Sequence, residues 1–319
     1  MNKPVQSLSI LIATHNRSVL LRQTLQSIGE WLLPAGVNIE LIVCANACTD
    51  GTAAACAPEL AKLPFAARCV SEPTPGLSAA RNRLLSESTG EVAAFLDDDV
   101  WVSRGWPGGI LDVFNNHPAD MVTGKVDLWW QAVQQPAWLS RRSAHMLSCL
   151  DHGDKVCEIF SAGEVIGANL ALRRAVLRDV PNFRSELGRS GKLMVAGDDT
   201  DFVARAMQAG HRVFYAPQAS LLHYVAPERI TLSYLGRSAA GIGTGKVRML
   251  GELSPAKRRA LKFENTVKYY LYGGLEVASA VAGYKKGRVN QHIRRMMCSG
   301  VLAGLADAPR GMSPPTAKP

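Results

Sequence analysis

Several features are missing from this chain of 319 residues, and each absence excludes a class of protein. Its apolar runs all fall short of the roughly 18 residues that a membrane-spanning helix needs. The seven cysteines are odd in number and lack the spacing of a disulfide framework. The N-terminus leads straight into a strand pattern without a signal peptide. These absences predict a cytoplasmic protein of a reducing compartment with no membrane-spanning helix.

Acidic residues are scarce in the last quarter of the chain. Residues 237–319 hold 15 Lys and Arg against 4 Asp and Glu, whereas residues 1–236 hold 21 against 23. Such a basic segment faces anionic lipid, a polyprenyl phosphate or nucleic acid, or it is a solvated surface. No RNA- or DNA-binding motif accompanies the charge, so we expect no nucleic acid partner. The segment 255–300 is amphipathic and helical in pattern, and it is suited to peripheral membrane contact, to packing or to dimerisation.

A glycine-rich phosphate turn is missing after the first strand pattern. Residues 13–16 supply no such turn, which argues against a Rossmann dehydrogenase. The glycine-rich segment 241–246 lacks both a preceding strand and the Ser or Thr that follows the lysine of a P-loop. We interpret that segment as a turn or a flexible helix break.

Short apolar runs alternate with helical patterns through the first hundred residues. Strand patterns at 8–13, 39–45, 67–71 and 92–96 are separated by helical patterns at 19–31, 52–62 and 77–88. With 47% hydrophobic and 20% charged residues, the chain has the composition of a globular protein. The alternation predicts a parallel sheet wrapped by helices.

Polar clusters follow the four predicted strands, at 14–17, 46–50, 72–76 and 97–99. In sheets of this kind the ligand lies beyond the carboxyl ends of the strands. Three consecutive carboxylates directly after an apolar strand make a hard, oxygen-rich site that suits a divalent cation. We therefore expect a metal-bound diphosphate at this end of the sheet.

Five segments together resemble the inverting family 2 glycosyltransferases. They are residues 10–17, 49–52, 76–82, 95–99 and 197–202, in the order and spacing of that family. The resemblance implies an α/β fold of the GT-A type, which is a Rossmann-like nucleotide-diphospho-sugar transferase fold, here with a helical C-terminal appendage. It implies a catalytic domain over 1–236, with a nucleotide-binding half at about 1–128 and an acceptor half at about 129–236. A basic amphipathic helical region over 237–307 and a disordered tail over 308–319 complete the expected organisation.

The resemblance also implies roles for the acidic residues. Asp99 matches the ligand of Mg²⁺ or Mn²⁺, and Asp97 and Asp98 match carboxylates that lie near the ribose and the sugar. Asp199 matches the catalytic base, which takes the proton from the acceptor hydroxyl. The usual Glu-Asp pair is Asp198-Asp199 here, and adjacent carboxylates raise a pKa in a way that suits a base.

Nucleotide binding is expected from the loops that follow the first three strands. The expected nucleotide-sugar-binding residues are Ala13, Thr14, Asn16, Arg17, Asn46, Gly76 and Arg81, together with Asp97 and Asp98. Asn46 stands where the family often has an acidic residue, and its amide oxygen still accepts a hydrogen bond. The alternative for Arg81 is an exposed helix arginine paired with an acid. His223 matches a histidine that some relatives place near the metal or diphosphate, and a structural role is its alternative.

The stretch 129–164 loses the alternation of strands and helices and contains Trp129, Trp130 and Trp138. Long loops of this kind are commonly functional, so we expect the acceptor there, with packing of a lid or core as the alternative. The predicted function is metal-dependent transfer of one sugar from a nucleotide-diphosphate sugar, with UDP favoured, to a glycan or lipid-linked acceptor. Such a reaction belongs to cell-surface polysaccharide or glycolipid synthesis at the inner face of the membrane. The alternatives are a polyprenyl-phosphate sugar synthase and a non-catalytic sugar-nucleotide-binding protein.

Overall fold

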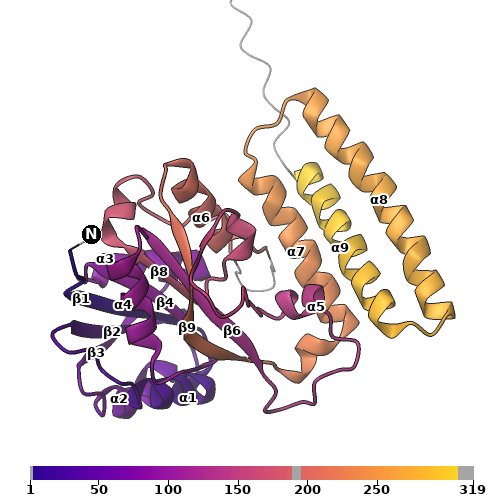
Figure 1. The fold of residues 1–319 in the computed structure, drawn as a ribbon. Helices are drawn as coiled ribbons and strands as arrows, with labels where there is room; N and C mark the ends of the chain where they lie inside the picture. Colours follow the sequence, from indigo (N-terminus) through magenta and orange to yellow (C-terminus); the bar gives the residue numbers. More distant parts are fainter. Residues whose placement is uncertain (1–2, 189–194, 308–319) are drawn as a thin grey trace, which may run out of the picture. The chain divides into compact units, whose positions relative to one another are not determined.

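The computed structural model describes residues 3–188 and 195–307. These residues divide into two compact units (Figure 1). The first unit comprises residues 3–134, 147–185 and 198–227, and the second comprises residues 135–146, 186–188, 195–197 and 228–307. The tail predicted over 308–319 lies outside the described residues.

Nine strands form one sheet in the described part of the first unit. The strands are β1 Ser7–Thr14, β2 Asn38–Asn46, β3 Ala66–Glu72, β4 Val92–Asp97, β5 Val100–Val102, β6 Met121–Trp129, β7 Cys157–Ile159, β8 Asn169–Arg173 and β9 Val213–Tyr224. The helices of this unit are α1 Ser18–Gly29, α2 Thr52–Leu60, α3 Leu77–Glu87, α4 Trp106–Asn116 and α6 Asp198–Gln208. The strand order is β3-β2-β1-β4-β8-β6-β9-β5, and β7 pairs with β9.

The four strands predicted in the first hundred residues are parallel neighbours, as expected. β1 pairs with β2 and with β4, and β2 pairs with β3. The second half of the sheet is mixed, because β8 runs antiparallel to β4 and β6, and β5 runs antiparallel to β9. The stretch 129–164 also contains regular structure, namely β7 and a short helix, so its loss of pattern did not mean a continuous loop.

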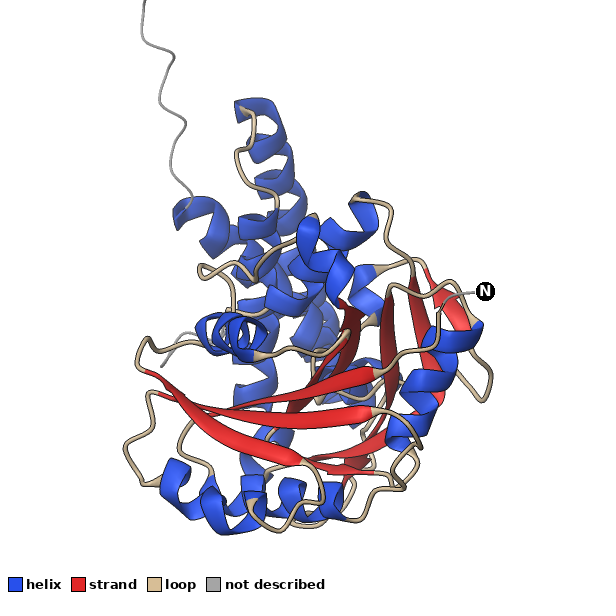
Figure 2. Cartoon of the chain, turned by 90° about the vertical axis from the view of Figure 1, so that its left-hand side faces the viewer, coloured by secondary structure: helices blue, strands red, loops and turns tan. Residues whose placement is uncertain are grey.

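Helices cover both faces of the sheet (Figure 2). Along β1, Ile10 and Ile12 belong to one hydrophobic cluster and Leu11 belongs to the other. This alternation follows from the two-residue period of a strand. The first cluster includes apolar residues of α1, α2 and α4, and the second includes residues of α3 and α6. A buried sheet of this kind holds its strand ends, and therefore its loops, in fixed positions.

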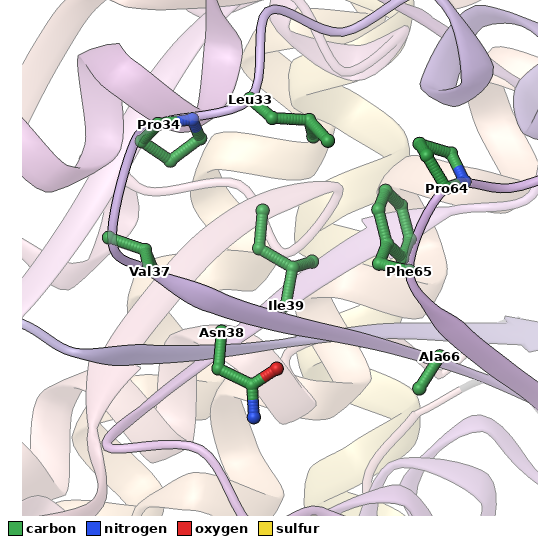
Figure 3. Close-up of a pocket in the computed structure, with 8 residues that line it drawn as sticks. All are labelled: Leu33, Pro34, Val37, Asn38, Ile39, Pro64, Phe65 and Ala66. Atoms are coloured by element: carbon green, nitrogen blue, oxygen red, sulfur yellow. The ribbon is translucent and has the colours of Figure 1, made fainter.

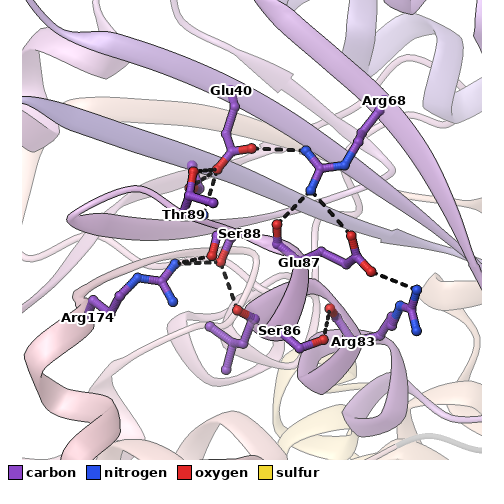
Figure 4. Close-up of polar contacts among 10 residues, drawn as sticks. Glu40, Arg68, Arg83, Ser86, Glu87, Ser88, Thr89 and Arg174 are labelled. Atoms are coloured by element: carbon purple, nitrogen blue, oxygen red, sulfur yellow. Dashed lines mark hydrogen bonds and ion pairs between the residues drawn. The ribbon is translucent and has the colours of Figure 1, made fainter.

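A polar network joins Glu40 of β2, Arg68 of β3 and the residues between α3 and β4, at the end of the sheet opposite the predicted ligand loops (Figure 4). Glu40 accepts hydrogen bonds from Ser9 Oγ and from the Thr89 backbone N–H, both at 2.7 Å, and from Arg68 at 3.0 Å. Burial raises the pKa of Glu40, but the hydrogen bonds from Thr89, Ser9 and Arg68 outweigh burial and lower it to about 2. The network therefore stabilises the ionised carboxylate.

The second unit is helical, with α5 Arg141–Met146, α7 Leu232–Met249, α8 Pro255–Val281 and α9 Lys285–Asp307. The interpretation of 241–246 as a turn or helix break is wrong, because the segment lies inside α7. Its glycines allow a close approach: a Cβ added to Gly243 would lie 2.2 Å from the Met297 backbone oxygen of α9. A Cβ on Gly300 of α9 would likewise lie 1.8 Å from the Ala240 backbone oxygen. Among the described residues, no helix combines the length and the apolar character needed to cross a bilayer.

Candidate functional site

Two carboxylates and an imidazole converge where β4 ends. Asp97 is the last residue of β4, and Asp98 and Asp99 connect it to β5. We call residues 97–99 the acidic step. β5 pairs with β9 so that Val100 lies opposite His223. His223 Nε2 lies 3.4 Å from Asp99 Oδ1 and 3.6 Å from Asp97 Oδ2. One ligand atom from each of these three residues lies within 4.8 Å of the other two. The structure thus brings together the two predicted metal ligands and adds Asp97 to them.

Arg17 binds the other side of the acidic step. Its Nη1 lies 3.1 Å from Asp98 Oδ1 and 3.0 Å from Asp99 Oδ2. Burial by itself lowers the pKa of Arg17, but Asp98 and Asp99 raise it above its ordinary value. Asp98 also accepts a 2.7 Å hydrogen bond from Thr14 Oγ1. Burial and the neighbouring Asp99 raise the pKa of Asp98 to about 6, against the opposing effects of Arg17 and Thr14.

Thr24 of α1 fixes the backbone of the acidic step, although it was not among the predicted site residues. Its buried Oγ1 accepts the Val100 N–H at 3.1 Å and lies 3.0 Å and 2.8 Å from the carbonyl oxygens of Asp98 and Val100. A signal was present in the sequence, because Thr24 interrupts the apolar face that Leu21 and Ile28 form. A buried hydroxyl needs a hydrogen-bond partner, and here that partner is the backbone beside the carboxylates.

The loops after β1 and β2 are joined by Asn16. Its Oδ1 accepts the Thr49 N–H at 2.8 Å, and its Nδ2 donates to Thr49 Oγ1 at 3.2 Å. The φ of Asn16 is 52°, a left-handed conformation that asparagine tolerates better than most residues. Ala13 is the penultimate residue of β1 and pairs with Asp97 in the register of β1 and β4. Ala13, Thr14 and Arg17 therefore adjoin the acidic step, whereas Asn16 joins their loop to the loop after β2.

Asn46 ties the second loop to the third. Its Nδ2 donates to the carbonyl oxygen of Thr74 at 2.7 Å, and its Oδ1 accepts the Gly76 N–H at 2.9 Å. His15 lies with Nδ1 2.7 Å from the Asn46 carbonyl oxygen. Asn46 and Gly76 are thus in direct contact, and the amide of Asn46 orders the loop after β3.

Asp199 lies in the first turn of α6, where two backbone N–H groups orient its carboxylate. Oδ1 accepts the Thr200 N–H at 2.7 Å, and Oδ2 accepts the Gly167 N–H at 2.9 Å. The side chain is partly exposed. The two amide donors fix the direction of the carboxylate, and its partial exposure leaves it accessible to a reacting hydroxyl. Gly167 was not predicted, since a single glycine without a turn motif carries no local signal.

Arg81 is buried, unlike the exposed arginine that was the alternative for this position. Its Nη1 lies 2.6 Å from Asp198 Oδ2, and its guanidinium lies over the rings of Phe95 and Phe183. Burial lowers the pKa of Arg81, but Asp198, Asp199 and Asp97 raise it above its ordinary value. The carboxyl group whose pKa is raised in the Asp198-Asp199 pair is Asp198, because of its burial. Arg81 therefore acts electrostatically on both the predicted base and the acidic step.

Aromatic side chains stand next to the candidate metal ligands in the chain. Trp129 at the end of β6 contacts Trp101 and Tyr224 edge-on, with ring centroids 5.8 Å and 6.1 Å apart. Trp101 follows the acidic step by two residues, and Tyr224 follows His223. Of the stretch predicted to meet the acceptor, Trp129 and Trp130 belong to the first unit and Trp138 belongs to the second.

A hollow of about 260 Å³ lies at the start of β2 and β3 (Figure 3). Its lining residues are Leu33, Pro34, Val37, Asn38, Ile39, Pro64, Phe65 and Ala66. Asn38 begins β2 whereas Asn46 ends it, so this hollow is at the opposite end of the strand from the candidate site. None of its lining side chains is titratable, and we assign it no part in the site.

This sheet and the loops at its carboxyl ends define a GT-A type of fold. The model of Glycosyl transferase family 2 matches residues 9–180, more than half of the chain. The chain belongs to that family. The residues that would act as base and as the histidine ligand, Asp199 and His223, lie beyond the matched segment.

Two curated relatives show how far the sequence similarity extends. The chain is 28% identical over 304 residues to the succinoglycan biosynthesis protein ExoM of Rhizobium meliloti. The aligned segment covers 93% of this chain and 92% of that protein. The chain is 27% identical over 164 residues to the glucosyl-dolichyl phosphate glucuronosyltransferase of Haloferax volcanii, which covers 50% of this chain and 51% of that protein.

Solved structures support the fold. The mannosyltransferase PcManGT from Pyrobaculum calidifontis, in complex with GDP-Man and Mn²⁺, matches with a TM-score of 0.66 and 19% identity over 96% of this chain and 88% of that chain. Staphylococcus aureus TarS 1-349 in complex with UDP matches with a TM-score of 0.52 and 14% identity over 91% and 90%. At these identities the likeness establishes the fold alone.

Proposed function

We propose that the protein is an inverting, metal-dependent glycosyltransferase that moves a single sugar from a nucleotide-diphosphate sugar to an acceptor hydroxyl. The observation that carries the proposal is the convergence of Asp97, Asp99 and His223 beside loops that are already tied together by hydrogen bonds. Membership of the family supports a transferase. The inverting course needs one carboxylate as base. Asp199 would take that role, and its hydrogen bonds from the Thr200 and Gly167 N–H groups support the assignment.

The donor set fits a divalent cation. An ion about 2.1 Å from each ligand atom spans ligands up to about 4.2 Å apart, and the separations of His223 from Asp99 and Asp97 are 3.4 Å and 3.6 Å. Carboxylate oxygens suit Mg²⁺ and Mn²⁺. When bound, the ion would neutralise charge on the leaving nucleoside diphosphate as a Lewis acid. Asp99 and His223 would hold it, with Asp97 beside them.

The protein's own residues would orient the donor and move the proton. Arg17 keeps the side chains of Asp98 and Asp99 in place from the side away from His223. Asn16, Asn46 and Gly76 order the loops that would receive the nucleotide, for which we favour UDP. Asp199 would then take the acceptor proton at the face of the sugar opposite the leaving group.

The acceptor would be a glycan or a lipid-linked precursor of a cell-surface polysaccharide or glycolipid. The similarity to ExoM over nearly the whole chain supports this class of product. We place the enzyme in the cytoplasm at the inner face of the membrane, since the basic C-terminal quarter suits an anionic surface. An acceptor that is itself a polyprenyl phosphate is already an anion and would have less need of Asp199.

The test is a panel of nucleotide sugars in which release of nucleoside diphosphate is measured with and without Mn²⁺ or Mg²⁺. We expect Asp199→Asn to lower the rate by about 10²–10⁴-fold with little change in donor binding. Asp99→Asn should abolish the turnover that Mn²⁺ or Mg²⁺ stimulates, and it should weaken Mn²⁺ binding measured by calorimetry. The matched control is Asp154→Asn, which alters an exposed carboxylate and should leave both unchanged.

Three results would contradict parts of the proposal. Turnover of Asp199→Asn at the wild-type rate would exclude Asp199 as the base. Turnover of the wild type at the same rate with and without metal would exclude a role for the cation. Tight donor binding without transfer to any hydroxyl or phosphate acceptor would favour the non-catalytic alternative.

A further inference from the structure

The outward face of α8 is apolar along most of the helix. Its exposed large apolar side chains, with one in the turn that follows, are Phe263, Val267, Tyr270, Leu271, Leu275, Val277, Val281 and Tyr284. Tyr270 is 73% exposed and Val281 is 86% exposed. Positions 263, 267, 270, 274, 277, 281 and 284 are spaced alternately by four and three residues, which places them on one stripe of the helix. We call the exposed apolar side chains named above, from Phe263 to Tyr284, the outer stripe of α8.

The inward face of the same helix is polar. Between Lys268 and Lys285 the one charged residue in the sequence is Glu276, and it lies 3.0 Å from His292 Nδ1 and 3.1 Å from Arg295 Nε of α9. Tyr269 also faces α9, beneath the guanidinium of Arg295. A helix on a water-soluble surface turns its apolar stripe inward and its charges outward. In α8 the polarity is reversed, so the outer stripe is suited to an apolar environment.

Cations flank the outer stripe at both ends. Arg259 and Lys262 are exposed at its start, and Lys285, Lys286 and Arg288 are exposed at its end. The exposed acidic residue near the stripe, Glu264, is paired with Lys268. An apolar stripe that carries tyrosines and is bordered by cations matches the layers of a bilayer surface, with acyl chains inside and anionic headgroups outside.

We propose that α8 lies in the surface of an anionic lipid bilayer, with its outer stripe among the acyl chains and its flanking cations at the headgroups. A second copy of this chain is a poorer occupant. Any two-fold pairing of two such helices, parallel or antiparallel, sets one cationic end against another. This inference deepens the membrane location given under the proposed function, and it is tested without sugar transfer, so the two can fail separately.

Flotation of the full chain with vesicles tests the proposal. The probes are vesicles of phosphatidylcholine alone and of phosphatidylcholine with 30 mol% phosphatidylglycerol. We expect the wild type to float with the anionic vesicles and to be released by salt. Tyr270→Asp/Val277→Asp should weaken binding at least tenfold, because it places charge on the outer stripe. The matched control, Leu32→Asp/Phe160→Asp, adds the same charge at exposed apolar positions of the first unit and should bind as the wild type does.

The cations have a test of their own. Lys285→Glu/Lys286→Glu should weaken binding to anionic vesicles by roughly 30-fold or more, whereas Lys3→Glu/Lys155→Glu, with the same change in net charge, should not. Circular dichroism must show unchanged helix content in every variant. The proposal is overturned if the wild type binds neither vesicle, or if the outer-stripe variant binds as tightly as the wild type. It is also overturned if sedimentation shows a dimer that the outer-stripe variant dissociates while no vesicle is bound.

Discussion

Replacing Gly167 with alanine tests how the predicted base is held. An alanine Cβ at this position would lie 2.5 Å from Arg81 Nη2 and 2.9 Å from Asp199 Oδ2. Contacts shorter than 3.4 Å are tighter than nine in ten that real Cβ atoms make, so the guanidinium would have to move by about 0.9 Å and the carboxylate by about 0.5 Å.

Arg81 has little freedom to yield. Its guanidinium is buried, lies over the rings of Phe95 and Phe183, and is held by Asp198 at 2.6 Å. The displacement should therefore fall on Asp199 and on its hydrogen bond to the Gly167 N–H. A misplacement of this order at a reacting group costs roughly 10²-fold in rate, or about 3 kcal/mol of transition-state stabilisation.

The assay is donor turnover at saturating metal, run beside thermal unfolding to separate lost activity from lost folding. The control is Gly163→Ala in the same segment, where an added Cβ meets only Ser161 Oγ at the ordinary distance of 3.7 Å. We expect kcat to fall about 10²-fold in the Gly167 variant and to stay near the wild-type value in the control. A folded Gly167→Ala protein with the kcat of the control would refute the reasoning, because Asp199 would then not need this backbone donor.

Two further predictions concern stability. The pKa of Glu40 falls from 4.5 to about 2 on folding. The ionised Glu40 therefore stabilises the folded state above pH 4.5, and this contribution is lost as the pH falls towards 2. Glu40→Gln should lower the free energy of unfolding in urea at pH 7 by about 1–2 kcal/mol after solvent screening, and it should flatten the pH dependence of that free energy below pH 4.5. An equal pH dependence in both proteins would contradict this. Gly300→Ala should destabilise the helical unit by about 1–3 kcal/mol, since its Cβ would meet the Ala240 backbone, whereas Gly274→Ala on the open side of α8 should stabilise it by up to about 1 kcal/mol. A Gly300→Ala protein that unfolds at the wild-type temperature or above it would exclude the close approach of α7 and α9.

The nucleotide-side half of the sheet was predictable because parallel strands buried on both faces give continuous apolar runs. The loops at 14–17 and 97–99 follow such runs directly, so their convergence needed no knowledge of distant residues. The antiparallel strands β8 and β5 were not predictable, because β8 pairs with β4 and β6, and β5 with β9, across long separations in sequence. The partner of Arg81 shows the same limit, since Asp198 lies 117 residues away.

The error at 241–246 has a physical cause as well. Glycine weakens an isolated helix, so a run of glycines predicts a break. In α7 the glycines permit backbone contact with α9, and packing between the helices outweighs the local preference. Thr24 is a different case, because its place on the apolar face of α1 is visible in the sequence, whereas its backbone partners, more than 70 residues away, are not.

The pairing of the three-residue β5 with β9 determines when, during folding, His223 joins Asp97 and Asp99. Residues 97–99 are synthesised long before residue 223, and β5 has no other strand partner among the described residues. The parallel half can collapse from contacts closer in sequence, while closing the loop between residues 100 and 223 is the slower event. The histidine therefore reaches the carboxylates only when β9 docks. The cluster of Asp97, Asp99 and His223 should then be complete only after β9 has docked, and a chain released before residue 223 would carry the acidic step without its imidazole.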